Sequence, residues 1–322
     1  MPISKLIWNM SLPIIASMLV QALYNIVDSV FVSRVSEQAL TAVSLAFPAQ
    51  NLMIGLATGT AVGVNALMGR ALGAGQRERA DKVANHGILL ALVGFVISAL
   101  LGATCSDLFF RSQTQIENII RMGNDYLRVV TIGSLGMFCQ IMYERLLQGT
   151  GRSILSMYTQ GLGAIINIIL DPIFIFALDM GTAGAGLATM LSQFCSFCIL
   201  LYGCTRGGNL PIRFRDFALT RAAAWEILRT GFPSMARQLL SATAAIALNW
   251  AARDYGDAAI AAMAIVSRLM SFANSAVLGF GQGYQPVCGF NYGAGRFDRV
   301  LEGYGFCIKT AVLSLVLLAA LG

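Results

Sequence analysis

Long apolar runs separated by short polar segments constrain this chain more than any other feature. A helix needs roughly 20 mostly apolar residues to cross a bilayer. Because the strands of a membrane barrel would be shorter and would alternate in polarity, the runs predict membrane-spanning helices. They lie at residues 10–33, 40–69, 84–105, 126–148, 155–178, 183–205, 227–251 and 259–288, and another begins near residue 303.

The composition agrees with a membrane protein. Hydrophobic residues make up 57% of the chain and charged residues 12%, and the mean hydropathy is +0.69. A soluble domain carries about 25% charged residues, so a soluble enzyme, a disordered chain and a nucleic-acid-binding protein are excluded. The sequence predicts an all-α polytopic membrane protein in the plasma membrane, which is the inner membrane of a bacterial cell.

Basic residues predict the orientation. Most Lys and Arg residues, Arg145 among them, are assigned to segments on the side of the N-terminus, and few lie opposite. The positive-inside rule therefore places the N-terminus in the cytoplasm, and the formal charge of +6 indicates topology rather than a nucleic-acid ligand. The basic residues of the opposite side are Arg34, Arg111, Arg121 and Arg253.

An internal repeat appears when the sequence is shifted by 220 residues. Pro13 then aligns with Pro233, and five glycines from Gly59 to Gly75 align with glycines from Gly279 to Gly295. Six spans per repeat give both copies the same orientation, which predicts a two-lobe parallel-repeat transporter with six helices per lobe. We expect residues 1–215 to form the first lobe and 216–322 an incomplete second lobe of a C-terminally truncated chain.

Ionisable residues deep in a span cost about 2.5–3.5 kcal/mol and mark ion or proton pathways. Asp28 shares one helical face with Gln21 and Asn25, at spacings of three and four residues. This polar stripe is expected to face the protein interior or a water-filled cavity. The alternative is an aspartate that only forms a hydrogen bond between helices.

The fifth run contains a second carboxylate beside a proline. Asn167 lies one turn before Asp171, and Pro172 leaves the carbonyl near residue 168 without its helical partner. Oxygen ligands suit a hard cation such as Na⁺, and a carboxyl group held away from water can instead carry a proton. The alternative is a structural kink. Glu144, near the end of the fourth run, is either a third such acid or an interfacial side chain in water.

Other motifs favour structure over chemistry. Gly55, Gly59 and Gly63 predict close helix packing. The glycine-rich segments 69–82 and 289–302 lack the ending of a phosphate-binding loop and are interpreted as turns. The single histidine, and seven cysteines without framework spacing, predict no metal centre or disulfide scaffold. We expect no cofactor besides a coupling ion, and no enzyme activity.

These patterns together resemble the multidrug and toxic compound extrusion (MATE) family. The resemblance implies two six-helix lobes around a central cavity, and export of organic cations by alternating access in exchange for H⁺ or Na⁺. The segments that carry it are the first run SLPIIASMLVQALYNIVDSVFV, its repeat TGFPSMARQ, the two GAG turns and NIILDPIFIF.

The resemblance also implies site residues. The family's coupling-cation site corresponds to Asp28, Asn167 and Asp171, which could hold Na⁺, with Thr189 as the hydroxyl ligand. Glu144 matches a glutamate that some members use. The residues expected in or near the substrate cavity are Gln21, Asn25 and Tyr126.

Two other functions stay open. A flippase for lipid-linked sugars would need a cationic cavity, and Arg237 and Arg268 favour it. The chain could also be a fragment of the antiporter that does not transport. For the antiporter, we expect a monomer whose partners are small organic cations and the lipid bilayer, with no nucleic acid.

Overall fold

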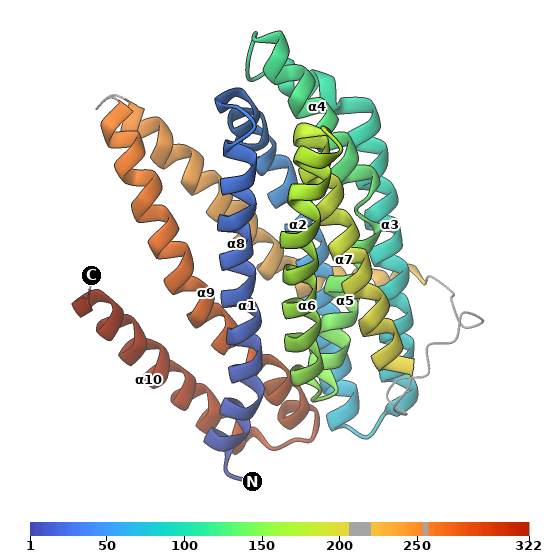
Figure 1. The fold of residues 1–322 in the computed structure, drawn as a ribbon. Coiled ribbons are helices and arrows are strands. Elements are labelled where there is room, and N and C mark those ends of the chain that lie inside the picture. Colours follow the sequence, from blue (N-terminus) through green and yellow to red (C-terminus); the bar gives the residue numbers. More distant parts are fainter. Residues whose placement is uncertain (206–219, 254–256, 322) are drawn as a thin grey trace.

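The computed structural model describes residues 1–205, 220–253 and 257–321, and all regular elements in these ranges are helical. Figure 1 shows them as a bundle of long helices. They are α1 (Ile3–Ser33), α2 (Glu37–Gly73), α3 (Arg77–Arg111), α4 (Glu117–Ile132), α5 (Leu135–Gly149), α6 (Ser153–Pro172), the π turn η1 (Ile173–Ala177), α7 (Gly181–Thr205), α8 (Arg221–Arg253), α9 (Asp257–Gly293) and α10 (Phe297–Leu321). The all-α prediction is confirmed.

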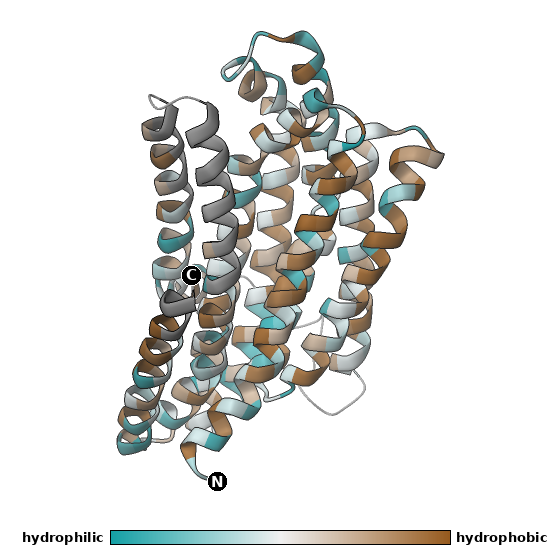
Figure 2. Ribbon diagram, turned by 60° about the vertical axis from the view of Figure 1, so that its left-hand side comes forward, coloured by the Kyte–Doolittle hydropathy of each residue, from teal (hydrophilic) through white to brown (hydrophobic). Residues whose placement is uncertain are grey.

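Several helices have the length and composition of membrane spans. Within the described ranges, five helices qualify: α1, α2, α3, α6 with η1, and α7. On α3, large apolar side chains such as Val96, Leu100 and Leu101 are exposed. Figure 2 shows hydrophobic residues along the helices and much of the hydrophilic colour at the turns. A bilayer core has no water to bond the backbone, and a helix pairs its backbone N–H and C=O groups internally. With five such apolar helices, the chain is a multi-pass membrane protein.

The fourth predicted span is divided. Residues 126–148 do not form one helix, because α4 ends at Ile132 and α5 begins at Leu135. The break falls on Gly133 and Ser134, a residue pair at which helices kink. A Cβ on Gly133 would lie 2.9 Å from Cγ of Met190 on α7. The glycine therefore lets the break pack closely against α7, and the prediction of one continuous helix here was wrong.

Helix boundaries follow the sequence repeat. The helix α2 spans residues 37–73 and α9 spans 257–293, so both ends are displaced by the same 220 residues. The turns that follow also match, since Gly75 has φ +74° and Gly295 has φ +71°. Glycine has no Cβ and adopts this left-handed conformation without strain. The helices α8, α9 and α10 thus repeat α1, α2 and α3.

The two repeats contact each other reciprocally. A Cβ on Gly63 of α2 would lie 3.1 Å from the backbone nitrogen of Gly231 on α8. A Cβ on Gly283, the equivalent of Gly63, would lie 2.8 Å from Cβ of Ser11 on α1, the equivalent of Gly231. Reciprocal pairs of this kind define a two-fold relation. The close packing predicted for the glycines of α2 is confirmed.

One pair of equivalent residues marks the axis itself. A Cβ on Gly69 would lie 3.5 Å from Cα of Gly289, and a Cβ on Gly289 would lie 3.5 Å from Cα of Gly69. Both residues precede the ends of α2 and α9, on the side of the bundle where the N-terminus lies (Figure 1). The repeats therefore touch closely on the N-terminal side. The predicted lobe boundary between residues 215 and 216 lies outside the described residues.

Candidate functional site

A cavity of about 380 Å³ lies between the two repeats. Residues of α1, α2 and α4–α7 line it from one repeat, and residues of α8 and α9 from the other. It contains most of the side chains singled out in the sequence. These are Gln21, Asn25, Asp28, Tyr126, Glu144, Asn167 and Thr189.

The polar stripe of α1 faces this cavity. Gln21, Asn25 and Asp28 all line it, as their shared helical face predicts. The Oδ1 atom of Asp28 is buried and has no hydrogen-bond partner in the described part of the chain. Asp28 also interacts electrostatically with Asp171, so the two carboxyl groups belong to one site.

Asn167 connects two other predicted residues. Its side chain is 1% exposed, and that of Asp171 is fully buried behind the cavity wall. The amide nitrogen Nδ2 of Asn167 donates to Oδ1 of Asp171 at 3.4 Å and to Oγ1 of Thr189 at 3.4 Å. Both contacts are longer than the usual 2.9–3.0 Å. The structure therefore brings Asn167, Asp171 and Thr189 into one loosely bonded cluster.

Three acceptor oxygens in this region lack partners. Besides Oδ1 of Asp28, Oδ1 of Asn167 and Oδ2 of Asp171 are buried without a hydrogen bond to the described residues. An unsatisfied buried acceptor costs about 1–3 kcal/mol. Unpaired oxygens from two carboxylates and one amide are suitable ligands for a hard cation, and a proton would satisfy one carboxylate. No group of three His, Cys, Asp or Glu side chains converges in the described ranges.

The helix changes its geometry just after this cluster. The π turn η1 follows Pro172, and the N–H of Leu178 donates to the carbonyl of Ile173 at 2.9 Å. Proline cannot donate the next helical hydrogen bond, and single π turns are frequent at functional sites. The bend expected at Pro172 thus takes the form of a widened turn next to Asp171.

Tyr126 reaches the cavity from α4. Its hydroxyl accepts a hydrogen bond from Nε2 of Gln50 on α2 at 2.9 Å. The ring is 4% exposed, and a Cβ on Gly186 of α7 would lie 3.3 Å from its Cδ2 atom. Tyr126 therefore has a fixed position beside Asp28 and Asp171, with which it interacts electrostatically.

Glu144 and Arg145 are both part of the cavity wall. The Glu144 carboxylate accepts a hydrogen bond from Oγ of Ser156 at 2.7 Å. Arg145 is 7% exposed and donates to Oε1 of Gln148 at 3.0 Å. The side chain of Asn65 donates to the Arg145 carbonyl at 2.7 Å. The assignment of Arg145 to a cytoplasmic segment was wrong, because α5 continues past it into a buried contact with α2.

The opposite repeat contributes a second arginine. Arg237 of α8 lines the cavity together with Gln238 and Gln282. The side chain of Arg268 lies outside the described residues. Sequence patterns mark Arg237 only as a basic residue within an apolar run, and they miss its position opposite Arg145.

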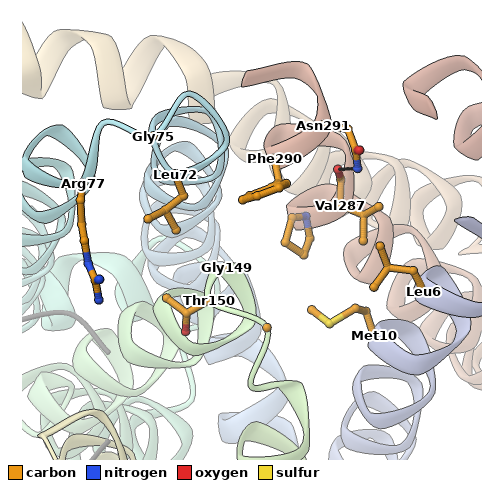
Figure 3. A pocket seen from close by; sticks show the side chains of 12 residues that line it. Leu6, Met10, Leu72, Gly75, Arg77, Gly149, Thr150, Val287, Phe290 and Asn291 are labelled. Atoms are coloured by element: carbon orange, nitrogen blue, oxygen red, sulfur yellow. Dashed lines mark hydrogen bonds between the residues drawn. The ribbon is translucent and has the colours of Figure 1, made fainter. Parts of the chain in front are cut away.

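A second cavity lies on the N-terminal side of the bundle. Its volume is about 570 Å³. Figure 3 shows Leu6 and Met10 of α1 near Val287 of α9. Phe290 and Leu72, which also line this cavity, lie on the opposite side of Val287. Its wall is mainly apolar, and it holds none of the predicted site residues.

The MatE family model matches residues 13–173 and 233–322. The chain belongs to the MatE family. The two matched segments begin at Pro13 and Pro233, which differ by the same 220 residues as the internal repeat. This is the family that the sequence motifs resemble.

Similar proteins of the family have been described in bacteria. The chain is 24% identical over 320 residues to the multidrug export protein MepA of Staphylococcus haemolyticus, covering 99% of this chain and 70% of MepA. It is 27% identical to the probable multidrug resistance protein YoeA of Bacillus subtilis, covering 90% of this chain and 65% of YoeA.

Solved structures show the same arrangement of helices. A MOP superfamily transporter from Pyrococcus furiosus is 31% identical and superposes with a TM-score of 0.93, over 99% of this chain and 72% of that one. A MATE transporter in an outward-facing conformation is 30% identical, with a TM-score of 0.92, over 100% of this chain and 72% of that one. The fold of this MatE protein is therefore that of a MATE transporter.

Proposed function

We propose that this MatE protein exports organic cations across the membrane in exchange for H⁺ or Na⁺, by alternating access. The names of MepA and YoeA, a multidrug export and a multidrug resistance protein, support drug export as the activity. The observation that carries the coupled mechanism is the set of unpaired buried oxygens on Asp28, Asn167 and Asp171.

The proposed coupling follows from charge. The carboxylate of Asp28 in the cavity wall interacts with that of Asp171 behind it, and between apolar helices a negative charge costs free energy unless a cation balances it. A proton, Na⁺ or a cationic substrate can each supply that balance. Ion binding at Asp28 and Asp171 would lower the affinity for a cationic substrate, and such differential affinity is what coupling requires.

The cavity wall suits substrates of varied shape. Methionines from four helices line it, together with apolar side chains such as Phe47 and Ile54. Methionine is flexible and polarisable, and it is common at promiscuous binding surfaces. The methionines are Met18, Met53, Met137 and Met190.

We further propose that the protein lies in the plasma membrane with a cytoplasmic N-terminus. The packing of Gly69 against Gly289 then closes the cytoplasmic side of the cavity. This arrangement corresponds to an outward-facing state. Substrate would be released from this state and a coupling ion taken up.

Ethidium efflux from drug-sensitive cells tests the proposal. We expect cells that express the chain to lose ethidium faster than control cells, and Asp28→Asn or Asp171→Asn to abolish this gain. Asp179→Asn is the matched control, since Asp179 is exposed in the turn after η1, where asparagine tolerates its positive φ of 52°. Collapse of the H⁺ or the Na⁺ gradient identifies the coupling ion. Export that survives both aspartate variants contradicts the mechanism, and absence of export favours the non-transporting fragment.

A flippase for lipid-linked sugars is the second candidate. It is favoured by the presence of Arg145 and Arg237 in the cavity wall, where guanidinium groups could bind pyrophosphate. Asp28 and Glu144 in the same wall disfavour a dianionic ligand. A lipid-linked sugar that moves across vesicles containing the protein, while ethidium does not, would reverse this order.

A further inference from the structure

The charged residues of the central cavity indicate a preferred class of substrate, a conclusion that rests on the proposed export function. Arg145 is 93% buried in the bundle, since only 7% of it is exposed. Its one hydrogen-bond acceptor among the described side chains is Gln148, and no carboxylate lies within ion-pair distance of it there. A buried charge that forms no ion pair is costly, so the site favours an anionic partner.

Arg237 adds a second positive charge at the same place. It reaches the cavity from the other repeat and interacts electrostatically with Arg145. No described residue forms an ion pair with Arg237. Two guanidinium groups that repel each other across a cavity gain stability when an acidic group binds between them, and guanidinium groups bind carboxylates in a bidentate manner.

Glu144 balances part of this charge. Its carboxylate accepts a hydrogen bond from Ser156, and it interacts electrostatically with Arg145 without forming an ion pair with it. Glu144, Arg145 and Arg237 together carry one net positive charge. A single carboxylate on a ligand would neutralise this end of the cavity.

The remaining charged side chain of the wall, Asp28, lies farther from the N-terminal side. Arg237 is equivalent to Ser17 under the repeat shift, and a two-fold axis along the membrane normal places equivalent residues at one depth. Asp28 is eleven residues beyond Ser17, or roughly 16 Å along the helix at 1.5 Å per residue. The cavity therefore has negative charge toward one end, from Asp28 with Asp171 behind it, and one unbalanced positive charge toward the other.

We propose that Arg145 and Arg237 form a subsite for the acidic group of a zwitterionic substrate, whose basic group faces Asp28. The protein then prefers amphoteric aromatic compounds to simple cations of the same shape.

Two dyes test this subsite. Rhodamine 123 is a cationic methyl ester, and rhodamine 110 has the same ring system with a free carboxylate. Binding is measured by fluorescence polarisation with the purified chain in nanodiscs. We expect the unmodified chain to bind rhodamine 110 more tightly than rhodamine 123. Arg237→Gln should raise the Kd of rhodamine 110 about tenfold and change the Kd of rhodamine 123 less than twofold. Arg237→Lys, which keeps the charge, should recover part of the loss.

Control variants separate the possible outcomes. Arg229→Gln makes the same change on an exposed residue of α8 outside the cavity wall, and it should leave both dyes unaffected. Arg145→Gln should act like Arg237→Gln, provided that the variant elutes as a monodisperse peak. The proposed subsite is refuted if Arg237→Gln weakens the binding of both dyes equally, or if it leaves the binding of rhodamine 110 unchanged. If rhodamine 123 does not bind the unmodified chain, the proposed site for cationic drugs is contradicted. The effect of Arg237→Gln on rhodamine 110 binding still tests the subsite in that case.

Discussion

The imidazole of His86 on α3 holds Thr220, the residue that precedes α8. Nε2 of His86 accepts a hydrogen bond from the backbone N–H of Thr220 at 3.3 Å and lies 3.1 Å from its hydroxyl oxygen. Nδ1 lies 2.7 Å from the carbonyl oxygen of Lys82, which can only accept. Nδ1 therefore carries the proton, and the neutral ring joins the start of α8 to α3.

We predict that His86→Phe lowers the thermal stability of the protein. The phenyl ring keeps the packing of the imidazole, which is 9% exposed, but it cannot bond to Thr220 or Lys82. Loss of a buried hydrogen bond costs about 1–3 kcal/mol, so the unfolding temperature in detergent should fall by several degrees. Differential scanning fluorimetry measures it, with Cys105→Ser on the exposed part of α3 as control. An unchanged midpoint would show that the contact contributes nothing.

A second link between α3 and α8 should matter much less. Arg79 and Glu226 form an ion pair at 3.1 Å, but 58% and 48% of their side chains are exposed. Exposed ion pairs contribute about 0–1 kcal/mol and weaken with salt. Glu226→Gln is therefore expected to move the same midpoint by less than His86→Phe. A larger shift than that of His86→Phe would refute this ranking.

Two glycines of α9 should respond oppositely to alanine. A methyl group on Gly283 would collide with Ser11 of α1, whereas one on Gly281 has nothing within 4 Å. Gly283→Ala should destabilise by about 1–3 kcal/mol through overpacking. Gly281→Ala should be neutral or stabilising by up to about 1 kcal/mol, because alanine favours the helix. Thermal unfolding of both variants checks the prediction, which fails if the two midpoints coincide.

The hydroxyl of Thr189 should be required for coupling. Thr189→Val keeps the shape of the side chain but removes the oxygen that accepts from Asn167. The amide would then lose one of its two partners, and a bound cation would lose a potential ligand. We expect at least a tenfold loss of ethidium efflux for Thr189→Val and near-normal efflux for Thr189→Ser. Equal activity of the two variants would exclude a role for the hydroxyl.

Local patterns were enough to predict part of the site. The helical spacing of Gln21, Asn25 and Asp28 placed them on one face, and Asn167 and Asp171 stand one turn apart for the same reason. The repeat also predicted which helices would correspond. These features depend only on periodicity and on equal spacing along the chain.

Other features depend on contacts between distant segments. Arg145 looked like a cytoplasmic charge because it lies near the end of an apolar run, and its burial follows from contacts with Asn65 and Gln148. Its neighbour across the cavity, Arg237, is 92 positions away in the sequence. The break between α4 and α5 did leave a local signal, the pair Gly133 and Ser134, which an otherwise apolar run concealed.

The mutual contact of Gly69 and Gly289 also bears on how such a chain arose. Each glycine packs against its own counterpart, and the surfaces around them exchange equivalent partners. One copy of the repeat therefore carries both halves of the interface. A shorter ancestor could have dimerised through this surface before its gene was duplicated, and fusion would have required a linker rather than a new interface.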